Sequence, residues 1–387
     1  MRMLLLFQAV WISASTYAIY KLCLHRKFSE ITALCISIIY SLFYGIQAAV
    51  FFDFHPVVIG VGLLAWLVYF LETKKKKACW ITLVLVILTQ ENMGIALICL
   101  AAIYFWKKEY RNISIAFLVI GILWSVISMK IVAYFSPIGF QYTPQISTNV
   151  IEIFKEFFDS EEKRQVWLYS MSWFSFLPLL SPGAILAVVI DLAQYFVTGP
   201  EFSRMWSPLM HHRAILAPLL TLGMMDALAF LHKRRLHPQM IAILALVIAA
   251  GVQFYFHFPL NKLSKVEYWK SESWMADNTK LIEQVPNDAS VATQQDLIPH
   301  LSHRKEIYLF FAREHDFNDK RCGQISCWWL DFNNNAKYLV VDLHPNQWIT
   351  QLLETNDHVE SAVTNMEKSG KISLVTSVGA ARFYTIH

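Results

Sequence analysis

The sequence predicts an α-helical polytopic membrane protein that ends in a small α/β domain. Of its 387 residues, 56% are hydrophobic and only 16% are charged, whereas about 25% of the residues of a soluble domain are charged. The net charge of +4 says little by itself, because the basic residues cluster beside apolar runs. This clustering is a topology signal and indicates no nucleic-acid partner. From about residue 260 the long apolar runs stop, and charged and amide residues become common.

Ten apolar segments are predicted to be membrane passages. Several are shorter than the roughly 20 residues that cross a bilayer, so we expect some of them to tilt or to end inside the membrane. The segments are residues 3–20, 31–52, 57–71, 78–89, 94–106, 113–135, 166–181, 184–198, 214–231 and 239–258.

Basic residues follow the first, third, fifth and ninth of these segments. If every segment crosses, all these clusters lie on one side, which the positive-inside rule makes cytoplasmic. We therefore expect a multi-pass protein of the cell inner membrane or plasma membrane, with its C-terminal domain extracytoplasmic. The same count places Met1 outside, which suggests that upstream sequence is missing from this chain. The clusters are Lys21, Arg26 and Lys27, then residues 74–77, 107–111 and 233–235.

Two domains are predicted: a transmembrane helical domain over residues 1–259 and an extracytoplasmic α/β domain over residues 260–387. The second part is long enough to bury one small core. Its alternating and periodic apolar residues predict the following elements. Strands are expected at 290–293, 307–311, 338–342 and in a hairpin over 372–386, and helices at 274–284, 348–354 and 358–368. In the membrane part, residues 149–164 are expected to form an interfacial amphipathic helix.

Cys322 and Cys327 lie close together in the polar C-terminal part. Outside the cytoplasm, such a pair can form a short-loop disulfide. Two unpaired thiols are the alternative, and the sequence leaves the choice open.

A polar triplet, Gln90, Glu91 and Asn92, interrupts apolar sequence between the basic clusters. Its flanking arms, residues 78–88 and 94–106, are each too short to span a bilayer. The triplet is therefore either the turn of a helix pair that stops short of the far surface or a break in a crossing helix. Both readings place the Glu91 carboxylate at membrane depth, which is costly unless it faces water or a partner.

Several polar side chains fall at passage ends on the same predicted side as Glu91, and convergent passage ends are where multi-helix proteins build sites. Carboxylates and imidazoles can act as a general base or as metal ligands, and guanidinium groups can hold a phosphate. Whether a divalent metal takes part is left open. The predicted catalytic residues are Glu91, Asp53 and His55, and the predicted substrate-binding residues are His211, His212, Arg213 and Arg204.

Each candidate also has a structural alternative. Asp53 and His55 would form a turn, because Pro56 suits a first helical position. Glu91 would cap the following helix. Arg204 and Arg213 would contact lipid headgroups.

Stretches of this sequence resemble, in order, a family of bacterial and archaeal membrane proteins known as domain of unknown function 2079. They are residues 51–56 (Phe-Phe-Asp-Phe-His-Pro), 88–94 (Leu-Thr-Gln-Glu-Asn-Met-Gly), 176–182 (Phe-Leu-Pro-Leu-Leu-Ser-Pro) and 212–218, with 289–292 and 299–304 in the C-terminal part. That family is similar to the GT-C superfamily of membrane glycosyltransferases. The resemblance implies a GT-C-like fold and an enzyme that takes sugar from a polyprenyl-phosphate donor at the extracytoplasmic face.

The chain departs from the family pattern at three places. Family members have an upstream helix and an acidic loop before the equivalent of Met1, their acidic residue after Asp-Phe-His-Pro is Val57 here, and their Lys-Glu-Asp is Gln90-Glu91-Asn92. The implied function is a glycosyltransferase that is incomplete or inactive as given. The alternatives are a transporter or lipid-handling protein, although the sequence has no inverted repeat, and a non-catalytic remnant. The expected partners are the lipid bilayer and a polyprenyl-phosphate sugar.

Overall fold

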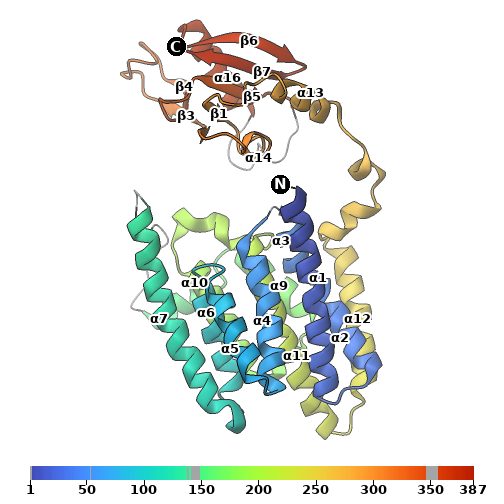
Figure 1. Cartoon of the computed structure of the whole chain (residues 1–387). Helices are drawn as coiled ribbons and strands as arrows, with labels where there is room; N and C mark the ends of the chain where they lie inside the picture. The colour runs from blue at the N-terminus through green and yellow to red at the C-terminus, as the bar shows by residue number, and fades with distance from the viewer. Residues whose placement is uncertain (1, 53, 137–138, 141–148, 346–355) are drawn as a thin grey trace. The chain divides into compact units, whose positions relative to one another are not determined.

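The computed structural model describes residues 2–52, 54–136, 139–140, 149–345 and 356–387. The chain divides into two compact units, Arg2–Tyr268 and Trp269–His387 (Figure 1). The first unit is built from helices, and the second holds all the strands found in the described part of the chain. The division lies a few residues beyond the predicted domain boundary at 259/260.

The first unit contains twelve of the described α-helices, joined by short turns and 3-10 segments (Figure 1). They are α1 Arg2–His25, α2 Glu30–Ser41, α3 Tyr44–Phe52, α4 Pro56–Glu72, α5 Lys76–Ile87, α6 Met93–Tyr104, α7 Arg111–Phe135, α8 Val150–Glu156, α9 Glu161–Trp173, α10 Pro182–Phe196, α11 Leu216–Lys233 and α12 Pro238–Tyr255. The 3-10 segments are η1 Lys108–Tyr110, η2 Leu177–Leu180, η3 Pro200–Trp206, η4 His211–Ile215, η5 Pro259–Ser264 and η6 Val266–Trp269.

The prediction of ten membrane passages is not confirmed. Within the described residues, four helical stretches are long and apolar enough to cross a membrane, or five if the bent pair α2 and α3, with its 43° break, is one span. The other predicted passages are helices of 12 to 17 residues. A helix of 12 residues is about 18 Å long and cannot cross a hydrocarbon core of about 30 Å. The four stretches are Met3–His25, Lys108–Phe135, Phe202–Lys233 and Pro238–Tyr255.

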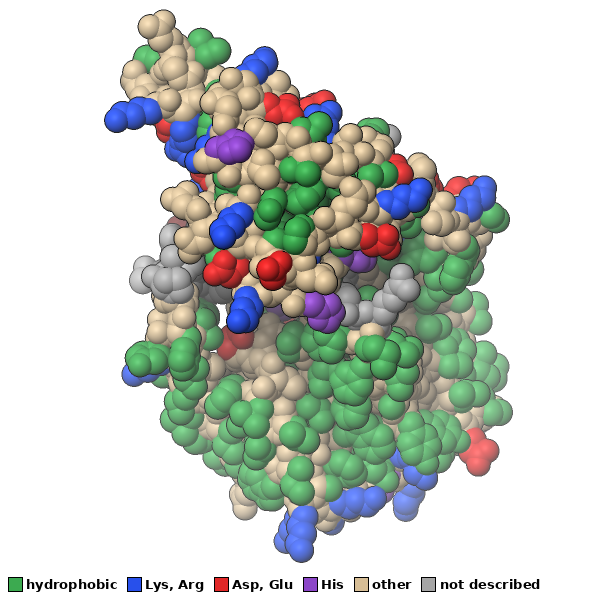
Figure 2. Space-filling model, turned by 45° about the horizontal axis from the view of Figure 1, so that its top comes forward, with side chains coloured by type: hydrophobic (Ala, Val, Ile, Leu, Met, Phe, Trp, Pro, Cys, Tyr) green, Lys and Arg blue, Asp and Glu red, His purple; other side chains and the backbone are tan. Residues whose placement is uncertain are grey.

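Exposed apolar side chains cover the helical unit. On α7, for example, Ile122, Leu123 and Val126 are each about half exposed. Figure 2 shows hydrophobic side chains over the visible face of this unit and Lys and Arg side chains gathered at one end. A surface of this kind would aggregate in water and is suited to lipid.

Glycines allow close packing around the polar triplet. A Cβ on Gly94 of α6 would lie 2.7 Å from the carbonyl oxygen of Gly121 on α7, so the two helix backbones touch. A Cβ on Gly60 of α4 would lie 2.5 Å from Sδ of Met93, the first residue of α6. Small residues at such crossings are typical of helix packing in membranes.

A buried ionic network joins the ends of α1, α4, α6 and α11 beside the basic clusters. Arg26 donates from Nε to Glu72 at 2.9 Å and from Nη1 to Asp226 at 2.9 Å. Lys107 donates to the same Asp226 oxygen at 2.8 Å, and the Tyr104 hydroxyl donates to Glu72 at 2.5 Å. Glu72 is only 6% exposed. Arg26 and Lys107 belong to the basic clusters of the topology prediction, and the structure also gives these two residues a role in packing.

The second unit contains a mixed five-stranded sheet in the order β2-β1-β5-β7-β6. Strand β1 is parallel to both β2 and β5, and β7 is antiparallel to both β5 and β6. These strands match the predicted ones, and α13 and α16 match two predicted helices, whereas the helix predicted at 348–354 lies outside the described residues. The elements are α13 Ser273–Ile282, β1 Val291–Thr293, α14 Ile298–Leu301, β2 Ile307–Leu309, β5 Tyr338–Asp342, α16 Asn356–Lys368, β6 Ile372–Val378 and β7 Ala381–Ile386.

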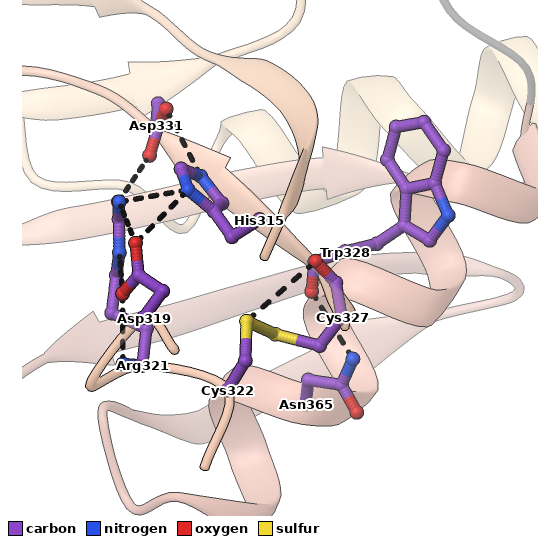
Figure 3. Close-up of a disulfide and its surroundings, with 8 residues drawn as sticks. All are labelled: His315, Asp319, Arg321, Cys322, Cys327, Trp328, Asp331 and Asn365. Carbon is purple, nitrogen blue, oxygen red and sulfur yellow. Dashed lines mark hydrogen bonds and ion pairs between the residues drawn. A yellow bond between two sulfur atoms is a disulfide. The ribbon is translucent and has the colours of Figure 1, made fainter. Parts of the chain in front are cut away.

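A second, two-stranded sheet was not predicted. It pairs β3 Phe311–His315 with β4 Cys327–Asp331. The Trp328 ring stacks on His358 of α16 with centroids 3.6 Å apart. Asn365 of α16 donates to the Trp328 carbonyl at 3.1 Å (Figure 3). These contacts fix β4 on α16.

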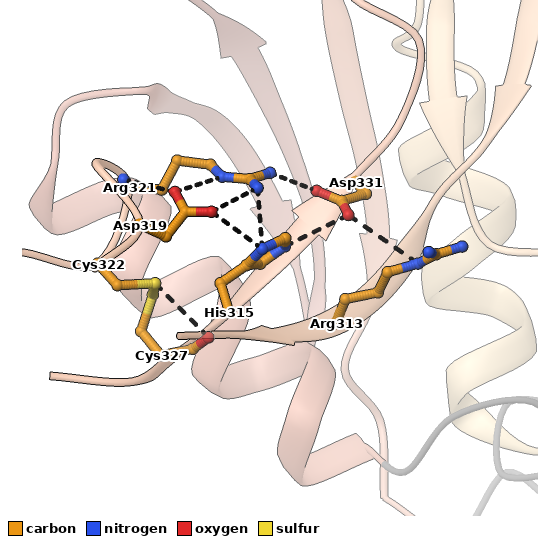
Figure 4. Close-up of polar contacts among 7 residues, drawn as sticks. All are labelled: Arg313, His315, Asp319, Arg321, Cys322, Cys327 and Asp331. Carbon is orange, nitrogen blue, oxygen red and sulfur yellow. Dashed lines mark hydrogen bonds and ion pairs between the residues drawn. A yellow bond between two sulfur atoms is a disulfide. The ribbon is translucent and has the colours of Figure 1, made fainter. Parts of the chain in front are cut away.

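Cys322 and Cys327 form a disulfide at the start of β4 (Figure 3). Of the two alternatives that the sequence left open, the structure therefore contains the disulfide. In the same connection Arg321 donates to Asp319 at 2.8 Å and to Asp331 at 2.7 Å (Figure 4). The Arg321 guanidinium holds the pKa of the Asp319 carboxyl below its ordinary value.

Candidate functional site

Three histidine rings from two distant segments of the chain lie together in the first unit. The His55 and His211 ring centroids are 3.6 Å apart, and those of His211 and His212 are 4.0 Å apart. The His212 ring also stacks on Tyr195 of α10 at 5.0 Å. We call His55, His211, His212 and Tyr195 the histidine cluster. It joins the start of α4, the η4 segment and the end of α10.

The position of His55 follows from the local sequence. A residue that precedes proline is restricted to extended backbone, and His55 has φ −132° and ψ 130° before Pro56, which begins α4. Gln8 of α1 accepts from the His55 N–H at 2.9 Å and donates to the Ala49 carbonyl at 3.4 Å. The turn between α3 and α4 is thus held on α1.

Arg213 lies beneath the histidines and is fully buried. Its Nε donates to the Ser207 carbonyl at 3.3 Å and its Nη2 to the Met205 carbonyl. The guanidinium carbon lies 5.1 Å from the Tyr195 ring centroid, within cation–π range. Nη1 is buried and has no hydrogen-bond partner among the described residues.

A buried carboxylate, Asp191 of α10, lies within electrostatic range of Arg213. Its Oδ1 accepts from Gln194 at 3.1 Å, whereas Oδ2 has no partner in the described part of the chain. Asp191, Gln194 and Tyr195 occur at i, i+3 and i+4 and therefore share one face of α10. That spacing, in an otherwise apolar helix, is the signal that could have found Gln194 and Tyr195, which the sequence reasoning missed.

The polar triplet lies in the connection between two helices. Residues 89–92 join α5 to α6, and the other ends of these helices lie near the basic clusters. Whether the pair stops short of the far membrane surface stays a prediction. Glu91 is half-buried in this turn. Asn92 is 9% exposed and donates to the Tyr195 hydroxyl at 3.2 Å. One hydrogen bond and one ring stack therefore connect the turn to His212.

The structure brings together four of the seven predicted site residues. His55, His211, His212 and Arg213 lie in or against the histidine cluster. Glu91 lies in the turn beside it, next to Asn92. Arg204 is exposed on η3, and Asp53 lies outside the described residues. The roles assigned to all seven stay predictions.

The chemistry of the cluster combines proton transfer and anion binding. An imidazole nitrogen can accept or donate a proton, and a guanidinium can bind an anion through charge-assisted hydrogen bonds. Among the described residues, no group of three or more His, Cys, Asp or Glu side chains is arranged to hold a metal ion. The question of a metal therefore stays open.

Comparison with known proteins gives one family. The family described as "Predicted membrane protein (DUF2079)" matches residues 1–362. No curated protein and no solved structure matches the chain.

Proposed function

Because this chain belongs to the DUF2079 family of predicted membrane proteins, we propose that it is a membrane glycosyltransferase with a polyprenyl-phosphate-linked sugar as donor. The acceptor is a glycan, lipid or protein hydroxyl on the extracytoplasmic side. The positive-inside rule supports that side, since the basic clusters lie at the far end of α4 from His55.

The observation that carries this proposal is the buried Arg213, whose Nη1 has no partner among the described residues and whose guanidinium lies against Tyr195 of the histidine cluster. In the proposed reaction an acceptor hydroxyl attacks the anomeric carbon of the sugar, and the bond from that carbon to the phosphate oxygen breaks. The leaving polyprenyl phosphate gains negative charge, which the Arg213 guanidinium stabilises. The acceptor proton passes to Glu91 or to a cluster imidazole as general base.

The test is turnover of polyprenyl-phosphate sugars by the full chain in lipid nanodiscs. His212→Phe keeps a ring on Tyr195 but removes the proton-accepting nitrogens, and Arg213→Lys keeps the charge but loses the fork-shaped donor set. Glu91→Gln removes only a charge. We expect Arg213→Lys and at least one of the other two to lower turnover about 100-fold or more.

A matched control is His232→Gln, which changes an exposed histidine near the C-terminal end of α11. It should leave turnover unchanged, and all variants should retain the wild-type unfolding midpoint in detergent. Absence of turnover with every polyprenyl-phosphate sugar, or wild-type turnover in all three site variants, would contradict the proposal. Proton flux into vesicles that depends on His212, without sugar turnover, would favour a transporter instead.

A further inference from the structure

The sheet of the second unit has a topological switch point between β1 and β5. These strands are adjacent and parallel, but β1 continues through α14 to β2 on one side, and β5 continues through α16 to β6 beyond the other side. In open α/β sheets, ligands bind beyond the carboxyl ends of the strands at such a point. The residues at these ends are Gln294 and Asp296 after β1, and Asp342 and His344 at and after the end of β5.

Asp342 makes several hydrogen bonds with the other polar residues at this edge. Its buried carboxylate accepts from His344 Nδ1 at 2.6 Å and from Asn278 of α13 at 2.5 Å. The Gln294 side chain accepts from the Asp342 N–H at 2.5 Å and donates to the Asp342 carbonyl at 3.1 Å. Asp277 of α13 lies 3.2 Å from His344 Nε2. The carboxylate, imidazole and two amides are thus held by one another.

Two buried acceptor atoms beside Asp342 have no donor among the described residues. They are Oδ1 of Asp296 and Oδ1 of Asn278, and the Asn278 side chain is only 6% exposed. A buried acceptor without a donor is unfavourable and uncommon in native proteins. Burial and the neighbouring charge of Asp342 also raise the pKa of Asp296 to about 6.

The missing group is therefore a donor, and its charge is positive. Asp277 and Asp342 contact the His344 imidazole, and Asp296 lies within electrostatic range of Asp342, so carboxylates outnumber cationic groups among the described residues of this edge. The described residues here do not form a set of three or more His, Cys, Asp or Glu arranged for a metal ion. An ammonium group has three N–H donors and one positive charge, which are the features that these two acceptors lack.

We propose that the carboxyl edge of β1 and β5 binds the ammonium group of a ligand, with Asp296 and Asn278 accepting its hydrogen bonds. The ammonium belongs either to an amino sugar or to an ethanolamine headgroup. The inference stands on the second unit alone, so it can hold or fail whether or not the chain transfers sugar.

Calorimetric titration of the full chain in detergent tests this inference with two pairs of probes. Glucosamine is compared with glucose, and ethanolamine with ethylene glycol; within each pair an amine replaces a hydroxyl. We expect an amine to bind at least about tenfold more tightly than its hydroxyl analogue, because a hydrogen bond to a charged group is worth this factor or more. The pair with the larger difference identifies the source of the ammonium.

Asp296→Asn should weaken amine binding about tenfold or more, whereas Asp288→Asn, which changes an exposed carboxylate of the same unit, should not. Asp296→Asn is close in shape and removes a charge near Asp342, so it is expected to fold with an unfolding midpoint at or above that of the wild type. Unchanged amine affinity in this variant overturns the proposal. Failure of both amines to bind, equal binding of amine and hydroxyl probes, or displacement of the amine by Ca²⁺ at equimolar concentration also overturns it.

Discussion

The imidazole rings of His55 and His211 stack with centroids 3.6 Å apart, and this contact joins the start of α4 to the segment that leads into α11. At the other end of α4, Arg26 bridges Glu72 of α4 to Asp226 of α11. A helix of 17 residues is about 26 Å long. Polar groups therefore connect α4 and α11 at both ends of a largely apolar unit, and this connection holds η4, with His212 and Arg213, in place.

The Arg26 network should be a main source of stability for the first unit. Arg26→Met leaves the buried Glu72 without its cation, and breaking a buried ion pair costs about 3–5 kcal/mol. The unfolding midpoint in detergent should fall accordingly. Lys74→Met, at an exposed basic residue near the same end, should change stability by less than about 0.5 kcal/mol. Equal effects of the two variants would show that the network contributes no stability.

The disulfide predicts a count of reactive thiols. The chain has six cysteines, and four of them, Cys23, Cys35, Cys79 and Cys99, are free and buried. A thiol reagent should label four cysteines in denatured, unreduced protein and six after reduction. Mass spectrometry counts the labels. Cys322→Ser should yield five labels without reductant and, because the closed loop is short, lower the stability of the second unit by about 2 kcal/mol. Six labels on unreduced wild-type protein would contradict the disulfide.

The sequence predicted where helices occur better than how many cross a membrane. Each of the ten predicted segments contains helix, because apolar runs bounded by lysine or proline have few alternatives. Their lengths depend on turns without a clear sequence signal. The break between α2 and α3 at Leu42 and Phe43 contains neither Gly nor Pro. Helix α9 ends at Trp173, shortly before Ser175 and Phe176, which adopt positive φ.

The site was predicted in part, for a similar reason. Positions at passage ends placed His55, Glu91, His211, His212 and Arg213 on one side of the membrane, but they could not show which rings would meet. Tyr195 was missed because a tyrosine inside an apolar helix is ordinarily a packing residue. Strand β4 was missed because the contacts that fix it on α16, the stack of Trp328 on His358 and the hydrogen bond from Asn365, join residues far apart in the sequence.

Gly379 provides a test of the packing around His344. It adopts φ +60°, and a Cβ there would lie 2.9 Å from His344 Nε2 and would overlap the Asp277 carboxylate. Gly370 adopts φ +70° with nothing within 4 Å of its Cβ position. Gly370→Ala should therefore cost only the backbone strain of about 1 kcal/mol. Gly379→Ala should lower the free energy of unfolding by roughly 1–3 kcal/mol more than Gly370→Ala does. Denaturant unfolding of the full chain measures both variants.

If the two glycine variants lose the same stability, the contact of the β6–β7 turn with Asp277 and His344 is not close. If only Gly379→Ala also weakens amine binding, the turn helps to position the carboxyl edge of β1 and β5.

The raised pKa of Asp296 makes the stability of the second unit depend on pH in an unusual direction. The pKa of this carboxyl is about 6 in the folded protein, against an ordinary value of 3.8. Between these values the folded state binds more protons than the unfolded state, so stability falls as pH rises from about 4 to about 6. Above that range the ionised Asp296 carboxylate lowers the free energy of unfolding by at most about 2–3 kcal/mol.

Asp296→Asn should consequently stabilise the protein by about 2 kcal/mol near pH 7 and have little effect near pH 4. Asp342, Asp277 and His344 also face this edge, and taking the difference between wild type and variant at each pH removes most of their common contribution.

Asp319 provides a control of opposite sign, because Arg321 lowers its pKa in the folded protein. Asp319→Asn should destabilise the protein at neutral pH, and this effect should vanish as pH falls through the folded pKa of Asp319. Denaturant unfolding across this range measures both variants, and a stability difference for Asp296→Asn that does not change with pH would show that Asp296 is ionised in the folded protein at its ordinary pKa.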